Sequence, residues 1–232
     1  MHRLWLLLLA GILVAVVGCL STRTAPGEAR GAMPLEDGDH LEHAADKLKS
    51  GDEQAAIKHL QAHVSERPDA VMVRAYLAEL FFVSGDATNA RKQFAWFLRD
   101  AERVGGSSAR THRVHAHTRL MELAQELDQP AAEARHRGVG LVLLAEPWDR
   151  KSPEWETTLS QAVVALRQAT LLQPDDMEAW YYLALVQDRL GQPSAVQAIA
   201  RRVLRSLPDP AITPDMQLQL EEWCEGTVHS LK

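Results

Sequence analysis

Beyond residue 37, apolar and small side chains recur along the chain at helical spacing, and the pattern repeats itself. Gly51 and Gly85 lie 34 residues apart, and each is followed by an alanine and then a large apolar residue at matching distances. Pro174 and Pro208 are separated by the same 34 residues. A fixed period of this length is typical of helical solenoids, so the pattern predicts an all-α stack of antiparallel helix pairs.

The residues at these positions resemble the tetratricopeptide repeat (TPR), a family of helical solenoids that bind proteins and peptides. In that family small residues let the two helices of a unit approach closely, a glycine forms the turn between them, and a proline ends the second helix. His43, Gln187, Val196, Ala200 and Glu102 depart from the family pattern. Three units match the family pattern. The unit starting at Asp37 matches it at Ala44, Gly51, Ala56, Leu60 and Pro68, and the unit starting at Val71 matches it at Leu77, Ala78, Phe81, Gly85, Ala90 and Phe94. The unit starting at Met177 matches it at Trp180, Leu183, Ala184, Gly191 and Pro208.

The resemblance implies a tetratricopeptide-type helical solenoid that ends in a C-terminal capping helix. We expect two units over residues 38–104, an irregular region over 105–176, a third unit over 177–210, and the capping helix with a tail over 211–232. The stretch from Gly105 to Arg110 interrupts the register. Within the irregular region we therefore expect a degenerate helix pair over 112–127 and 130–144, and one longer helix over 154–173 with Ser152 as its N-cap.

The first eighteen residues have the character of an export signal. A short basic start is followed by an apolar run to Val17, which is the pattern of a secretory signal. Gly18 and Cys19 then resemble the end of a bacterial lipoprotein signal, in which a small residue precedes the cysteine that receives lipid. The resemblance implies a signal peptide over 1–18, a Cys19 that carries acyl chains such as palmitate, and a flexible tether over 19–37.

Two other interpretations of the N-terminus remain open, namely an uncleaved signal anchor and ordinary cleavage without lipid. The apolar run is near the lower limit for spanning a bilayer, which is why the anchor is retained. All three interpretations place the rest of the chain outside the cytoplasm, in the bacterial cell envelope. Leu20 follows the cysteine where an enterobacterial inner-membrane signal has aspartate, so the outer membrane is favoured over the inner one.

Composition and motifs exclude several classes of function. The net charge of −6 argues against a nucleic-acid partner, because phosphates are neutralised by clustered lysines and arginines. The two cysteines, Cys19 and Cys224, are too few for a disulfide framework or a zinc knuckle. The chain lacks the phosphate-binding, dinucleotide-binding, zinc-protease and serine-hydrolase signatures. We therefore expect no cofactor and no enzyme activity; an enzyme with an unrecognised site has no group of residues in its favour.

Histidines are the one residue type with the character of a site. His40 and His43 share a face of the first expected helix, and His59 and His63 are four residues apart on the second. In an antiparallel pair, His40, His43 and His63 could converge on zinc or copper. The alternative is that His43 and His63 are core residues and the other two are exposed. A second, looser group comprises His112, His115, His117 and His136.

The family resemblance also implies a partner-binding groove along the concave face of the solenoid. We expect it to be open, unless the tether or a neighbouring helix covers it. The early units would make it apolar and the last unit would make it mixed. The expected groove residues are Leu41, Ala45, Leu48, Met72, Ala75, Glu79, Phe82, Val83, Tyr181, Leu185, Asp188 and Arg189, with Glu178 beside them.

Taken together, the sequence predicts a lipid-anchored scaffold that binds a protein or peptide partner, with a role in assembling an envelope or secretion machine. A metal- or small-ligand-binding envelope lipoprotein is the alternative, through the histidines or a pocket beside Tyr181. Tyr181 belongs to the run Trp180, Tyr181 and Tyr182, and it is the one aromatic of the three that falls at an expected groove position.

Overall fold

A computed structural model describes residues 38–104 and 106–225 of the chain. Within these ranges every regular element is an α-helix, so the predicted all-α architecture of paired helices is confirmed. None of the helices in the described ranges is long and apolar enough to span a membrane. The signal peptide, Cys19 and the tether lie outside the described residues.

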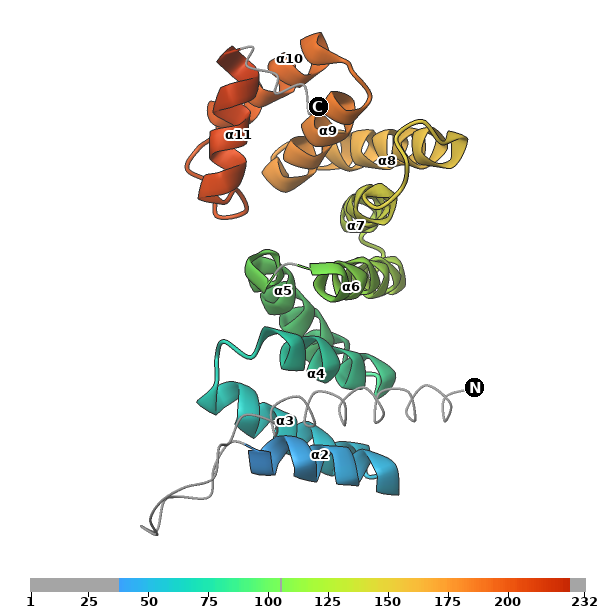
Figure 1. The fold of residues 1–232 in the computed structure, drawn as a ribbon, viewed down its shortest axis with the longest axis vertical. Coiled ribbons are helices and arrows are strands. Elements are labelled where there is room, and N and C mark those ends of the chain that lie inside the picture. The colour runs from blue at the N-terminus through green and yellow to red at the C-terminus, as the bar shows by residue number, and fades with distance from the viewer. Residues whose placement is uncertain (1–37, 105, 226–232) are drawn as a thin grey trace. The chain divides into compact units, whose positions relative to one another are not determined.

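The chain divides at Gly105 into two compact units, and the first unit consists of two antiparallel helix pairs. Helices α2 (Gly38–Ser50) and α3 (Glu53–Glu66) form one pair, and α4 (Val71–Val83) and α5 (Ala87–Val104) form the other (Figure 1). Helix α3 also packs against α4, which joins the pairs. Ten of the thirteen residues of α4 are buried, so α4 is the central helix of this unit.

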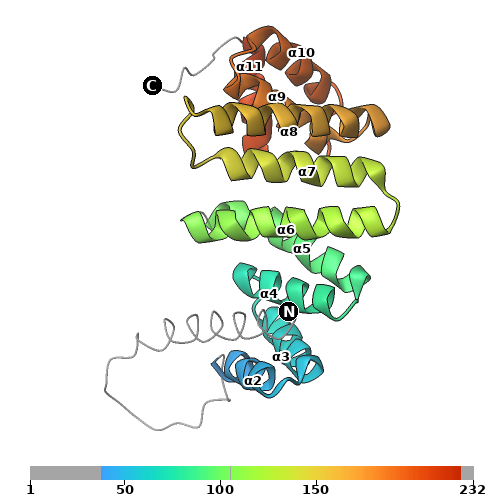
Figure 2. The same cartoon turned by 90° about the vertical axis from the view of Figure 1, so that its right-hand side faces the viewer.

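The second unit contains a layer of three long helices followed by a hairpin and a final helix. Helix α7 (Pro130–Ala145) lies between α6 (Gly106–Glu126) and α8 (Pro153–Leu172), as Figure 2 shows. Helices α9 (Met177–Arg189) and α10 (Pro193–Leu204) form the hairpin, and α11 (Pro214–Glu225) packs against α10. Helix α6 begins at Gly106, inside the stretch from Gly105 to Arg110 that was expected to interrupt the register.

Four of the turns between helices share one hydrogen-bond pattern. In the turn at Gly51, the N–H of Gly51 bonds to the carbonyl of Leu48 and the N–H of Asp52 to that of Lys47. This is the Schellman arrangement, which requires a left-handed residue at the turn. The same two bonds recur at the turns centred on Gly85, Asp128 and Gly191, where φ is +80°, +51° and +71°.

The helix after each of these turns begins in one of two ways. In the first unit, the residue after the glycine is an aspartate whose side chain caps the next helix: Asp52 accepts from the N–H of Ala55, and Asp86 from that of Asn89. In the second unit the corresponding residue is a glutamine without a capping bond, and a proline follows it at the first helical position. Sequence repetition therefore corresponds to repeated backbone geometry.

The hairpins α4–α5 and α9–α10 share a further feature, with its two residues exchanged. The Arg74 guanidinium on α4 lies over the Trp96 ring on α5, 4.7 Å from its centroid, and donates to the carbonyl of Pro68. On the other hairpin, Arg202 on α10 lies 4.4 Å from the centroid of the Trp180 ring on α9 and donates to the carbonyl of Pro174. In each case the arginine joins the two helices through a cation–π contact, and it also donates to the carbonyl of the preceding proline.

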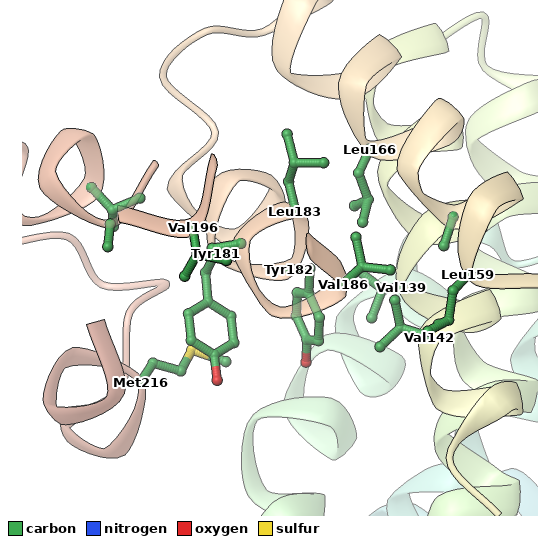
Figure 3. Packing of buried hydrophobic residues seen from close by; sticks show 14 of the residues in the cluster. Val139, Val142, Leu159, Leu166, Tyr181, Tyr182, Leu183, Val186, Val196 and Met216 are labelled. Carbon is green, nitrogen blue, oxygen red and sulfur yellow. The ribbon is translucent and has the colours of Figure 1, made fainter. Parts of the chain in front are cut away.

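The core of the second unit is a continuous cluster formed by α7 to α11. Val139 and Val142 of α7 meet Leu159 and Leu166 of α8, while Leu183 and Val186 of α9 extend the cluster toward α10 and α11 (Figure 3). Helices α7 and α8 come close at Gly138, where an added Cβ would lie 2.5 Å from Leu166 Cγ. A glycine is thus required at this point by packing. The N-cap of α8 is Ser152, as predicted, and its Oγ accepts from the N–H of Trp155.

Candidate functional site

The expected groove positions of α9 are occupied by other parts of the second unit. Tyr181 is only 7 % exposed; its hydroxyl donates to Gln219 Oε1 of α11 at 2.6 Å, and its ring lies 6.0 Å from that of Trp223. The prediction that Tyr181 faces an open groove is therefore wrong. The physical reason is that α11 packs its aromatic and apolar face over this side of α9, as Figure 3 shows for Met216.

The polar groove positions of α9 also have partners within the unit. Burial raises the pKa of the Asp188 carboxyl, while a hydrogen bond from Trp223 acts in the opposite direction. Arg189 donates to the carbonyl of Val142 at 3.3 Å, and its other nitrogen lies 3.4 Å from Glu146 Oε1. Leu185 is partly buried against the core cluster. These side chains hold α9 to α7 and α11, which leaves no open apolar groove along this helix.

The expected groove positions of the first unit are largely buried as well. Met72, Phe82 and Val83 are partly buried. Among the residues of this unit that the structure describes, no large apolar side chain is exposed. Most of the residues expected to line an apolar groove here instead form helix contacts, while Met72, Phe82 and Val83 keep part of their surface exposed. The residues that are fully buried are Leu41, Ala45, Leu48, Ala75 and Glu79.

The aromatic run of α9 is shared among three different contacts. Trp180 donates from Nε1 to the carbonyl of Pro174 and stacks with Arg202. Tyr181 and Tyr182 meet edge to face at 5.3 Å, and both are buried. Arg113 of α6 lies 3.5 Å from the Tyr182 hydroxyl. The run is therefore packing between α9 and its neighbours rather than an aromatic surface for a ligand.

The histidines of the first unit gather between α2 and α3. His40 and His59 have their Nδ1 atoms 3.4 Å apart, and the ring of His43 stacks on that of His59 at 5.2 Å. His63 is buried, and its pKa is lowered by burial and by the neighbouring His40. The structure thus brings His40 and His43 to His59, and His63 is near His40. In the described parts of the chain, no three His, Cys, Asp or Glu side chains stand ready to hold one metal ion.

In the second unit, a buried imidazole pair links α6 to α7. His117 and His136 have their Nδ1 atoms 3.1 Å apart, a hydrogen-bonding distance. Arg135 lies 3.4 Å from His136 Nε2, so this nitrogen accepts and His136 carries its proton on Nδ1. That proton is donated to His117 Nδ1. Burial, together with the charges of Arg113 and Arg135, lowers the pKa of His117 to about 3, so His117 is neutral near pH 7.

Arg135 extends this pair to α9. One of its guanidinium nitrogens lies 3.1 Å from Glu178 and 3.4 Å from Asp176, the N-cap of α9. Asp176 is buried and also accepts from the N–H of Ala179. Glu178, expected beside a groove, is thus an ion-pair partner of α7. Sequence reasoning identified the histidines and the acidic residues separately but did not place them in one network.

An exposed face that the sequence did not single out lies on α8. Val164 is 69 % exposed and Leu171 is 80 % exposed, more than any other large apolar side chain in the described ranges. They are seven residues apart and therefore lie on one face of the helix. Thr157, Ser160, Gln161 and Gln168 are exposed on the same face, and Arg167, three residues from Val164 and four from Leu171, adds one charge to it. The apolar residues of a helix usually mark its buried side, so this face was not evident from the pattern.

No model of a protein family matches the chain, and no curated protein matches it. Solved structures that resemble it include a crystal structure of MamA, with 14 % identity and a TM-score of 0.40 over 72 % of this chain and 90 % of that one. Another is TTC0263, a thermophilic TPR protein in Thermus thermophilus, with 16 % identity and a TM-score of 0.38 over 80 % of this chain and 97 % of that one. A third is YrrB, a TPR protein with an unusual peptide-binding site, with 13 % identity and a TM-score of 0.38 over 79 % and 90 %. Identities and TM-scores this low do not assign the chain to a family or a function. The description of the fold rests on the helices and turns described above.

Proposed function

We propose that the chain is a non-enzymatic, tetratricopeptide-type scaffold that binds a protein or peptide partner in the bacterial cell envelope. In this proposal lipid on Cys19 anchors it to a membrane, the outer one in preference to the inner, and the partner belongs to an envelope or secretion machine under assembly. The observation that carries the binding role is the exposed face of α8, where Val164 and Leu171 stand in solvent. Large apolar side chains held in solvent on one helix face are a feature of many protein contact sites.

The chemistry of this face limits the partner. Apart from Arg167, its side chains are apolar or uncharged and polar, and they extend from Thr157 to Leu171 along one side of the helix. Arg167 stands between Val164 and Leu171, and Glu156 is exposed beside the same edge of the face. We therefore expect a partner segment that presents apolar and uncharged side chains at its centre. A strongly basic segment would bury its charges without compensation here, and a strongly acidic segment would have only Arg167 to pair with on this face.

Site-specific photo-crosslinking in cells producing the full chain tests the binding role. We expect a crosslinker at Leu171 to give a discrete adduct with one protein, and Val164→Lys to abolish that adduct because it places a charge at the centre of the contact. The matched control is a crosslinker at Ala198, which is exposed on α10. An adduct that forms equally from Ala198, or that persists with Val164→Lys, would rule out α8 as the contact face.

A further inference from the structure

The spacing of His40 and His59 differs from that of an ordinary hydrogen bond. Their Nδ1 atoms are 3.4 Å apart, beyond the usual range of about 2.7–3.2 Å for a nitrogen donor. The buried pair His117 and His136, by contrast, stands at 3.1 Å. Two nitrogens bound tetrahedrally to one zinc ion, each about 2.0–2.1 Å from it, are about 3.3–3.4 Å apart. His40 and His59 therefore have the spacing of two ligands of a single ion.

The other nitrogen of His40 faces a carboxylate. His40 Nε2 lies 3.5 Å from Glu66 Oε1, across the end of the α2–α3 pair. Imidazoles that bind metal through one nitrogen usually direct the other to a carboxylate or carbonyl, which orients the ring and raises its basicity. Glu66 is thus placed to support metal binding by His40 at Nδ1.

A further imidazole nitrogen close to this pair lacks a partner. His63 is 5 % exposed, and its Nδ1 makes no hydrogen bond. Buried polar atoms in native proteins are nearly always hydrogen-bonded, so an unpaired nitrogen here requires an explanation. The His63 ring is close enough to His40 for the two imidazoles to interact electrostatically.

We propose that a divalent transition-metal ion of the zinc class binds between His40 and His59, so that it connects α2 to α3. Imidazole nitrogen suits such ions, whereas magnesium and calcium prefer oxygen ligands. No third ligand from the described residues stands in position, so the ion keeps positions for water, for a moving imidazole or for an external ligand. The inference does not depend on the partner proposed above, because it concerns the other unit of the chain.

Zinc titration of the full chain, produced without a histidine tag and purified in detergent, tests the site. We expect one equivalent of Zn²⁺ to bind with micromolar affinity, to raise the melting temperature and to release protons, while Mg²⁺ does none of these. His40→Ala and His59→Ala should each weaken binding by at least about tenfold, as expected when one of two ligands is lost. The matched control is His112→Ala on α6, whose Nδ1 lies 2.8 Å from the Ser108 carbonyl.

The outcomes separate the possibilities. Neither His40 nor His59 is fully buried, so both variants should keep the far-ultraviolet circular dichroism of the parent chain. Binding that weakens in both variants and stays within about twofold in His112→Ala supports the site. Three results would each overturn the proposal. They are Zn²⁺ binding that fails to saturate up to about 100-fold excess, a His40→Ala or His59→Ala variant that binds Zn²⁺ as tightly as the parent chain, and a His112→Ala variant that loses as much affinity as these two variants.

Discussion

In α7, Gly138 and Gly140 are two residues apart but have different surroundings. A Cβ at Gly138 would lie 2.5 Å from Leu166 Cγ and 3.3 Å from the Leu166 backbone nitrogen. A Cβ at Gly140 would lie 3.6 Å from His117 Cβ, an ordinary contact. Nothing in the sequence distinguishes these two glycines of one helix. The structure shows that only one of them is needed for packing.

We expect alanine at these two positions to have opposite effects on stability. Gly138→Ala should lower the free energy of unfolding by about 1–3 kcal/mol, because α8 must shift to admit the methyl group. Gly140→Ala should raise it by about 0.5–1 kcal/mol, because alanine has the better helix propensity and finds room. Chemical denaturation followed by circular dichroism measures both. Equal losses in the two variants would show that α7 and α8 are not in this close contact.

Asp128 offers a second test at the scale of one residue. It has the left-handed conformation, with φ of +51°, and it occupies the turn position that is glycine in the other three Schellman turns. Its side chain is exposed. We therefore expect Asp128→Gly to stabilise the chain by up to about 1 kcal/mol, since glycine avoids the steric cost of this conformation. A melting temperature that falls in the variant would mean that the aspartate side chain stabilises the turn in another way.

At the scale of elements, the buried imidazole pair makes the contact between α6 and α7 sensitive to pH. The pKa of His117 is near 6.5 in the unfolded chain and about 3 in the folded chain. Between these values the unfolded state binds a proton that the folded state does not, so stability falls as the pH falls. The full effect is present only when the pH has dropped below the folded pKa. His63, whose pKa is also lowered, acts in the same direction.

We expect the free energy of unfolding to fall by roughly 1 kcal/mol per pH unit between about pH 6 and about pH 4 on account of His117. His117→Gln cannot take up this proton and should show a shallower dependence, although it is less stable at neutral pH. Denaturation at a series of pH values gives the two slopes. The control is His112→Ala, an α6 histidine outside the buried pair, which should keep the parent slope. A slope in His117→Gln as steep as the parent's would exclude this pair as the source.

The same elements show what the sequence could and could not predict. The period of glycines and prolines placed the helix pairs, because turn geometry depends on local chemistry. The groove residues were misplaced, because whether a helical side chain faces solvent depends on which helix packs over it. Tyr181 is the clearest case: its position in the repeat is a groove position, but α11 covers it. Val164 and Leu171 were missed for the converse reason, since an apolar spacing does not reveal that its face lacks a neighbour.

At the scale of the whole molecule, the proposed anchor makes the location of the chain depend on one thiol. We expect cells that produce the full chain to incorporate labelled fatty acid into it, and Cys19→Ala to abolish that incorporation and leave the precursor uncleaved. Cys224→Ala, which removes the only other cysteine, is the matched control and should still be labelled. Labelling and processing that persist in Cys19→Ala would contradict the lipoprotein signal and favour the uncleaved anchor or ordinary cleavage.

The exchanged stacks at Arg74 with Trp96 and at Trp180 with Arg202 bear on how this chain can change over evolutionary time. The arginine and the tryptophan make the same contact between the two helices whichever helix carries each of them. Selection would therefore act on the arginine–tryptophan pair and not on the residue type at either position alone. A change at one member removes the stack while the other can still donate to the proline carbonyl, as Trp180 does to Pro174, whereas a reciprocal change keeps the stack. Exchanging the two residues between the helices requires two substitutions, and the chain with only one of them lacks the stack and is less stable. Each hairpin therefore tends to keep the arrangement of arginine and tryptophan that it first acquired.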